Sequence, residues 1–324
     1  KHNNLWDIAL NTENETKLKK SFLNGKLSEK INKRLKKYIE LNKSPLAVRS
    51  SSIFEDSQYK SLAGSYDTFM LPNNSSSHLK RLSDLKDAIK LVFASIFKST
   101  GKTLIKNSGH NIEEEKMAVI IQHIAGKKNK KESRFYPTFS GVIKGINYYP
   151  FSYMKRNEGI IYLALGFGRT IVDGEKCLAI SPKYPEVIPQ FHSYSSIIES
   201  TQNNFYALDL KRDTKLSKDL SIYSLDEAEK DNILHWVGSV ITKNDKQLRH
   251  SLLEEGTRIV SFAHILKWET FPICKIAKEF LKLGRSSLGC EVEIEFSVNM
   301  YKNKNADFNI LQIKPMSNVD INQK

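Results

Sequence analysis

The sequence predicts an α+β protein that folds into two lobes with a cleft between them. Amphipathic helical patterns dominate the N-terminal part, short strands follow between residues 117 and 179, and two more strands end the chain. With 324 residues the chain is long for one compact core, because domains usually contain roughly 100–200 residues. We place the division near residue 115, which gives an N-terminal lobe of residues 1–115 and a C-terminal lobe of residues 116–324.

The N-terminal lobe begins with a lysine-rich pattern. In residues 16–41 apolar side chains recur at helical spacing with an interruption near Asn24 and Gly25, which predicts two helices. Residues 46–52, LAVRSSS, start as a buried strand and become small and polar, as a strand leading into a ligand-facing loop does. Residues 79–97 place apolar side chains at i, i+3 and i+4 and predict an amphipathic helix.

The C-terminal lobe is predicted to be built around a sheet. The strands are MAVIIQHIA, FYPTFSGVIKG and GIIYLALGFG, and the chain ends with the strands EVEIEFSV and FNILQIK. Ser224 with Glu227 three residues later is typical of a capping box and predicts a helix over 224–241. A second helix is predicted over 272–283, after Pro272.

Charge and cysteine content exclude several classes of protein. The balance of 50 Lys+Arg against 36 Asp+Glu gives +14, but the basic runs are scattered and lack interleaved aromatic residues, so a solvated surface is favoured over a nucleic-acid site. Three distant cysteines form neither a disulfide framework nor a CxxC zinc pair and fit a reducing cytoplasm. No apolar stretch approaches the roughly 20 residues of a membrane span, so a soluble protein is expected. Because residue 1 is Lys, we expect an excised or processed piece.

The C-terminal strands carry the strongest chemical pattern. Glu291, Glu293 and Glu295 alternate in EVEIEF, so a strand would place all three carboxylates on one face. Alternating Glu residues can also form the solvent-exposed face of an edge strand. In the next strand Gln312 and Lys314 alternate too, and if the two strands pair, oxygen ligands and a cation share one surface. Such a set suits a magnesium ion that bridges nucleotide phosphates.

A second pattern lies after the first predicted strand. Arg49 is followed by Ser50, Ser51 and Ser52, and the loop AGSYDT follows at residues 63–68. A guanidinium at a strand end can grip phosphate oxygens, and small residues let backbone N–H groups approach them. The alternative is a polar surface loop with an Asp–Arg pair. There is no GxxxxGK[ST] run, so a P-loop fold is not expected.

Two further patterns are weaker. The glycines of the Gly166-Phe167-Gly168 turn are interpreted as serving tight turning. His123 lies on a strand and is more often a packed histidine than a catalyst there, since no Ser or Cys stands beside it in a recognisable elbow.

Taken together, these segments resemble the N-terminal nucleotide-binding domain of pyruvate phosphate dikinase and phosphoenolpyruvate synthase. Residues 45–73, PLAVRSSSIFEDSQYKSLAGSYDTFMLPN, are similar to the family's VRSS…ED…S.AG..DT signature, and MAVIIQHIAG, TFSGVI, LGFGRTIVDG, EIEF and LQIKP follow in the family's order. The resemblance covers residues 44–316. It implies an ATP-grasp-like fold with a nucleotide cleft between the lobes, ATP and Mg²⁺ as cofactors, and a phosphotransferase activity.

The resemblance also implies roles for single residues. Arg49, Glu295 and Gln312 would be catalytic, with Glu295 and Gln312 also holding the metal. Further phosphate contacts would come from a loop with Ser50, Gly64, Ser65 and Thr68. A hinge of Gln122, His123 and Ile124 would read the adenine edge through its backbone. Glu293 and Lys314, at the end of the sheet, would also contact the nucleotide. Glu291 receives no role.

The sequence also departs from the family pattern. Lys314 stands where the family usually has Arg, which keeps the charge but loses the planar fork. The T-x-H-A-type histidine motif is absent and no barrel is recognised, so the phosphohistidine and pyruvate-binding domains are expected outside these residues. The leading hypothesis is transfer of phosphate from ATP to that histidine and on to pyruvate. Transfer to another acceptor, an antibiotic or a glucan, and a non-catalytic nucleotide-sensing module stay open.

Overall fold

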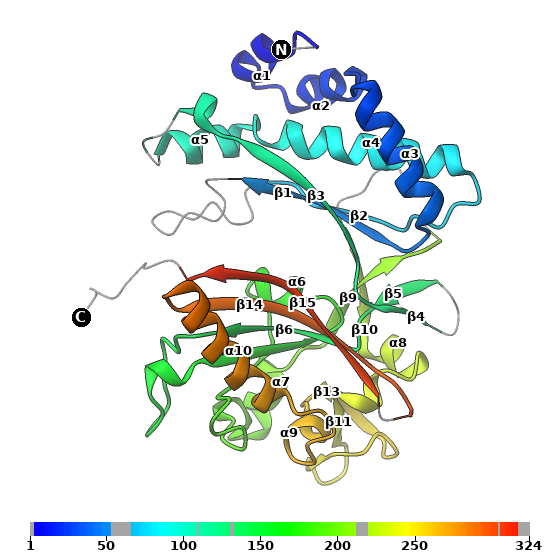
Figure 1. Ribbon diagram of the computed structural model, residues 1–324. Coiled ribbons are helices and arrows are strands. Elements are labelled where there is room, and N and C mark those ends of the chain that lie inside the picture. Colours follow the sequence, from blue (N-terminus) through cyan, green and yellow to red (C-terminus); the bar gives the residue numbers. More distant parts are fainter. Residues whose placement is uncertain are drawn as a thin grey trace. The chain divides into compact units, whose positions relative to one another are not determined.

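The chain forms two compact units, the first ending at Ile124 and the second made of Ala125–Lys211 and Ser221–Met316 (Figure 1). The computed structural model describes residues 3–52, 66–107, 109, 111–129, 133–211, 220–303 and 305–316.

The first unit begins with the helices α1 (Trp6–Asn11), α2 (Glu15–Asn24) and α3 (Glu29–Leu41). The side chain of Asn14 accepts a hydrogen bond from Lys17 N at 2.9 Å and starts α2. Ser28 caps α3 in the same way by accepting from Ile31 N. A polar side chain at this position satisfies a backbone donor that the helix itself leaves unpaired. The predicted pair of helices with a break near Gly25 is confirmed.

An antiparallel sheet follows these helices, in the order β2-β1-β3. Its strands are β1 (Leu46–Ser52), β2 (Phe69–Leu71) and β3 (Met117–His123). The long helix α4 (His78–Ser95) packs on one face, and α5 (Ser99–Asn107) and the short 3₁₀ helix η1 (Ile112–Glu114) lead into β3. The predicted strand LAVRSSS and the predicted helix over 79–97 are both present.

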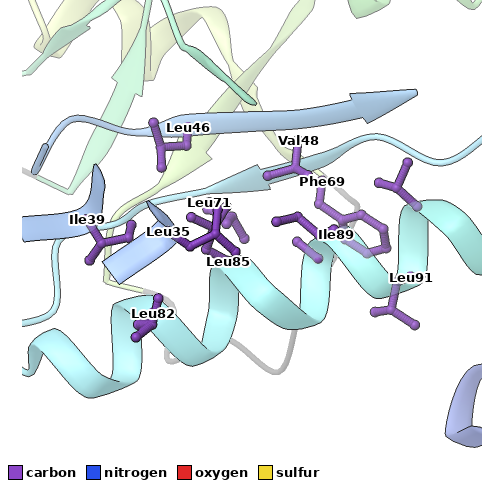
Figure 2. Close-up of a cluster of buried hydrophobic side chains, with 12 residues drawn as sticks. Leu35, Ile39, Leu46, Val48, Phe69, Leu71, Leu82, Leu85, Ile89 and Leu91 are labelled. Atoms are coloured by element: carbon purple, nitrogen blue, oxygen red, sulfur yellow. The ribbon is translucent and has the colours of Figure 1, made fainter. Parts of the chain in front are cut away.

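The core of the first unit lies between the sheet and its helices. Figure 2 shows Leu46 and Val48 of β1 pointing toward α4, where Leu85 is completely buried. Burying one such side chain contributes about 1.5–3 kcal/mol, so this layer fixes which face of β1 is turned inward. The cluster comprises Leu35, Ile39, Leu46, Val48, Phe69, Leu71, Leu82, Leu85, Ala88, Ile89, Leu91 and Val92.

The second unit is organised around an antiparallel sheet in the order β15-β14-β6-β7-β8. One face is covered by α10 (Ile273–Leu288), which approaches β14 so closely that a Cβ on Gly284 would lie 2.7 Å from a methyl group of Val292. Ile294 and Phe296 share that face and are fully buried. The strands are β6 (Phe139–Lys144), β7 (Ile160–Leu165), β8 (Leu178–Ile180), β14 (Val292–Met300) and β15 (Ala306–Pro315).

Smaller sheets complete the second unit. One has the order β10-β9-β5-β4, with β4 (Lys127–Lys128), β5 (Arg134–Tyr136), β9 (Asn204–Asp209) and β10 (Ser221–Ser224). The other has the order β12-β11-β13, with β11 (Gly238–Thr242), β12 (Leu248–Arg249) and β13 (Gly256–Val260). The short helices are η2 (Arg156–Glu158), α6 (Arg169–Val172), η3 (Pro189–Phe191), α7 (Tyr194–Ser200), α8 (Leu225–Lys230), η4 (Leu234–Trp236) and α9 (Ala263–Leu266).

A buried ionic network joins β5 to α8. Asp231, just after α8, accepts from Arg134 Nε at 3.0 Å and Nη2 at 2.8 Å, and from the Tyr136 hydroxyl and Asn129 Nδ2, each at 2.8 Å. Glu227 of α8 takes the third guanidinium nitrogen at 2.6 Å. The side chains of Arg134 and Asp231 are 7% and 1% exposed, so their charges are compensated by each other and not by water.

The predicted helix over 224–241 begins where expected, after Ser224, but ends already at Lys230. Within residues 224–241 the α-helix is limited to α8, and the chain continues as the 3₁₀ helix η4 and the strand β11. The Glu227 carboxylate does not fold back to close a capping box, because it bonds Arg134 and Lys230, each at 2.6 Å. The β-branched sequence of β11 pairs with β12 and β13, and sheet pairing there outweighs the local helical spacing.

The predicted strand FYPTFSGVIKG divides into β5 and β6, which belong to different sheets. The other predicted strands are present, and α10 runs five residues beyond the predicted end at 283. The compact units divide after Ile124, whereas the sequence placed the division near residue 115. The difference concerns β3, which pairs with β1 along its whole length and so belongs to the sheet of the first unit. Within the described ranges, none of the helices combines the length and apolar character of a membrane span.

Candidate functional site

In the first unit, β1 presents Arg49 on the face away from α4. Leu46 and Val48 face α4, and since side chains alternate along a strand, Arg49 and Ser51 lie on the other face. Gln122 pairs with Ala47 and therefore shares the face of Arg49. Ser50 lies on the helix side and is 2% exposed, so its hydroxyl and the Arg49 guanidinium point in opposite directions.

The end of the predicted phosphate loop is anchored to helices of the same unit. Asp67 forms an ion pair with Lys98 at 2.6 Å, and its backbone N donates to the Ser95 hydroxyl of α4. The Tyr66 hydroxyl donates to Glu115 at 2.6 Å. These contacts fix the backbone on which the half-buried Thr68 enters β2. Gly64 and Ser65 lie outside the described residues.

The predicted hinge lies at the end of β3, an edge strand of its sheet. The backbone N of Ile124 donates to the carbonyl of Pro45 at 3.0 Å, so this donor is already used within the unit. Hydrogen-bonded and non-hydrogen-bonded pairs alternate along an antiparallel ladder, and the bond from Ile124 to Pro45 makes His123 and Leu46 a non-hydrogen-bonded pair. The backbone N–H and C=O of His123 therefore point away from β1, toward the open edge of β3. The His123 ring lies 6.4 Å from the Tyr38 ring of α3, but the residue is exposed, so the packed position that the sequence favoured is not confirmed.

In the second unit, the predicted pairing of the two C-terminal strands is confirmed. β14 and β15 are antiparallel, with Glu293 opposite Lys314 and Glu295 opposite Gln312. Residues directly opposite one another in a ladder share a face. The four predicted residues of these strands therefore lie together, on the face of β14 away from α10.

Glu293 is the electrostatic centre of this face. Its carboxylate lies 3.0 Å from the ammonium of Lys314 on one side and 3.0 Å from that of Lys144 on the other. Burial acts to raise the pKa of Glu293, but the two lysines outweigh burial and hold the pKa below its ordinary value. Lys314 is also 3.9 Å from Glu295. The carboxylate of Glu293 is thus ionised and bonded on both oxygens.

The structure separates Glu291 from the other two glutamates. It precedes β14, and its carboxylate accepts from Arg285 Nε of α10 at 2.9 Å. Arg285 also donates to the carbonyls of Gly145 and Asn157, at 2.9 and 2.8 Å. Glu291 therefore holds the end of α10 to the strand ends. The prediction that a strand sets three carboxylates on one face is wrong for Glu291.

Sequence reasoning missed the continuation of the polar face along β14. Ser297 and Asn299 keep the alternation of Glu293 and Glu295 and are 1% and 4% exposed. Among the described residues, Ser297 Oγ and Asn299 Oδ1 are buried without a hydrogen-bond partner. Buried polar atoms are nearly always paired, so a ligand or water bonded here would satisfy them. The signal was available, because the alternation continues past EVEIEF in the sequence itself.

Magnesium suits the donors on this face. Glu295 and Gln312 offer one carboxylate and one amide oxygen on neighbouring strands, and Mg²⁺ is usually bound by one or two carboxylates together with water and substrate phosphates. Across the described part of the chain, no group of three or more Asp, Glu, His or Cys side chains is placed to hold a metal alone. The donor set therefore fits an ion that is shared with a phosphate chain.

A cavity of about 520 Å³ lies elsewhere in the second unit, beside α8 and β13. None of the predicted site residues lines it. Two of its charged lining residues pair with each other, since Arg258 bonds both oxygens of Glu229 at 2.9 and 3.0 Å. The chemistry of the polar face on β14 and the cavity are thus separate features.

Comparison with known families identifies the fold as a nucleotide-binding domain. The family described as "Pyruvate phosphate dikinase, AMP/ATP-binding domain" matches residues 3–324. The chain belongs to this family. As a pyruvate phosphate dikinase AMP/ATP-binding domain, it is an ATP-binding member of a phosphotransferase family, with the mixed helix and sheet architecture described above. No curated protein matches the chain.

Proposed function

We propose that this domain binds MgATP and supplies phosphate to a histidine on a separate swivelling domain, from which it passes to pyruvate. AMP remains once both terminal phosphoryl groups have left, one by way of the histidine to pyruvate and the other to water or inorganic phosphate, which agrees with a family named for both AMP and ATP. The observation that carries the proposal is the row of Glu295 and Gln312 beside Lys314 on the polar face of β14 and β15. Positioning and charge neutralisation are what phosphoryl transfer requires of a binding domain.

In this proposal the fold is ATP-grasp-like and residues of each unit contact the nucleotide. Arg49 and Thr68 contact phosphate, and the backbone around His123 reads the adenine edge. Glu295 and Gln312 hold Mg²⁺, whose charge offsets that of the phosphates when it is bound. The cysteines Cys177, Cys274 and Cys290 are free thiols, which supports a cytoplasmic location for such an enzyme.

Thermal stabilisation by MgATP tests the binding step. At a ligand concentration of 100 Kd, binding to the folded state adds about 2.7 kcal/mol of stability, which raises Tm measurably. Arg49→Ala and Glu295→Ala should abolish the rise, whereas the exposed controls Arg34→Ala and Glu279→Gln should retain it. An unchanged Tm of the wild-type chain at millimolar MgATP would refute the proposal.

The identity of the nucleotide product tests the transfer step. The chain is incubated with MgATP and a phosphohistidine domain of a phosphoenolpyruvate synthase, and nucleotides are separated by chromatography. AMP is the expected product. Formation of ADP alone would exclude a dikinase reaction, and binding without turnover would favour the nucleotide-sensing alternative.

A further inference from the structure

Lys144 is the last residue of β6. It lies directly opposite Glu293 on one side of β14, as Lys314 does on the other side. Three adjacent strands thus place a lysine, a glutamate and a lysine in one row across the polar face. The Lys144 ammonium is 3.0 Å from Glu293 Oε2, and that of Lys314 is 3.0 Å from Oε1.

The row carries one net positive charge in a half-buried place. The side chains of Lys144, Glu293 and Lys314 are 32%, 18% and 23% exposed. Water screens charges less here than at an open surface. One carboxylate orients both ammonium groups but does not neutralise both, and the next carboxylate on the face, Glu295, lies 3.9 Å from Lys314. When a cation bound at Glu295 offsets that second carboxylate, the row attracts an anion.

The surroundings of Lys144 hold its ammonium in place and leave it partly exposed. The nitrogen lies 5.9 Å from the centre of the Tyr162 ring on β7, in addition to its contact with Glu293. An ammonium has three N–H donors, and one bond to Glu293 Oε2 does not exhaust them. The next position of β14 on this face is Glu295, opposite Val142 of β6. Lys144 is therefore a fixed cation one step along the face from the expected metal ligand.

We propose that Lys144 binds a phosphate group of the nucleotide and that Glu293 is the residue that positions it. The proposal rests on the nucleotide-binding function proposed above and adds a residue to it. The family usually has an Arg at the position of Lys314. In this chain, Lys144 and Lys314 on either side of Glu293 take the place of that single guanidinium. Glu293 acts through the lysines and does not itself contact the metal, because both of its oxygens are bonded to ammonium groups.

Calorimetric titration with ATP, ADP and adenosine in the presence of Mg²⁺ tests this role. A charge-assisted hydrogen bond contributes about 1.5–3 kcal/mol, so Lys144→Met should weaken ATP binding about tenfold or more. Adenosine binding should not change, since adenosine has no phosphate. Lys144→Arg should recover most of the affinity for ATP. The control Lys183→Met removes another ion pair, that with Glu158 at 2.7 Å, and should bind ATP like the wild type.

The double variant Lys144→Met/Glu293→Gln separates phosphate binding from neutralisation of Glu293. If Lys144 served only to neutralise Glu293, removing both charges would restore wild-type affinity for ATP, and that result would overturn the proposal. We expect the affinity to stay low. Unchanged ATP binding by Lys144→Met, or an equal loss for adenosine, would overturn it as well. A wild-type chain that binds no MgATP would instead contradict the proposed function, so the two failures are distinguishable.

Discussion

The buried network around Asp231 makes a quantitative prediction about stability. Asp231→Asn places an amide NH₂ against the guanidinium of Arg134, which donates to Asp231 at 3.0 and 2.8 Å in the native chain. In the variant, Glu227 is the only carboxylate that still accepts from the guanidinium. The Tyr136 hydroxyl and the Asn129 amide then donate to a neutral acceptor in place of a charged one, which weakens both hydrogen bonds. Breaking a buried ion pair by removing one charge typically costs about 3–5 kcal/mol.

The size of the loss follows from burial. Asp231 is 1% exposed on its side chain and Arg134 is 7% exposed, so water cannot replace the missing charge. For domains of roughly 150–250 residues, each kcal/mol lowers Tm by about 2–4 °C, which predicts a decrease of roughly 6–20 °C. The measurement is denaturant unfolding followed by circular dichroism, together with a thermal scan. The rise in Tm that MgATP produces should persist, because the residues of the Asp231 network are not among those proposed to contact the nucleotide.

Two controls make the prediction decisive. Glu269→Gln breaks a pair with Lys275 in which both side chains are more than half exposed, 67% and 74%, and should cost under about 1 kcal/mol. The apolar double variant Arg134→Met/Asp231→Leu should recover much of the loss, because neither charge is then buried alone. If Asp231→Asn is no more destabilising than Glu269→Gln, the reasoning from burial is refuted.

Three further predictions concern the polar face and its sheet. Gly141→Ala should destabilise the fold by about 1–3 kcal/mol in denaturant unfolding, since a Cβ there would lie 2.3 Å from the Phe296 ring and 2.6 Å from the carbonyl of Tyr162; wild-type stability would contradict this. The pKa of Glu293 is lower in the folded than in the unfolded chain, where it is about 4.5. The stability that ionised Glu293 contributes is therefore present above the unfolded pKa and is lost as pH falls through the folded pKa. Between pH 7 and pH 3 the unfolding free energy of Glu293→Gln should accordingly decrease less than that of the wild type. Mg²⁺ alone should leave Tm unchanged while MgATP raises it, and an equal shift by Mg²⁺ alone would show a preformed metal site.

The sequence by itself determined the local elements and the chemical character of the site. Helical spacing in residues 79–97 fixed α4, and the alternation in EVEIEF and LQIKP fixed which side chains of β14 and β15 face the same way. The signature around Arg49 indicates the family to which the chain belongs. Each of these properties is local, because side-chain periodicity depends only on backbone geometry over a few residues.

Only the tertiary structure decided which residues meet. The sequence gives no sign that Lys144 lies opposite Glu293, since that contact exists only because β6 pairs with β14. The segment after Lys230 becomes a strand and not a helix, because sheet pairing and the buried bonds of Asp231 outweigh local spacing. Glu291 follows the pattern of its neighbours yet bonds Arg285, because it lies before the strand begins. Periodicity tells which face of an element is apolar, but long-range pairing and the need to compensate buried charge select the partner.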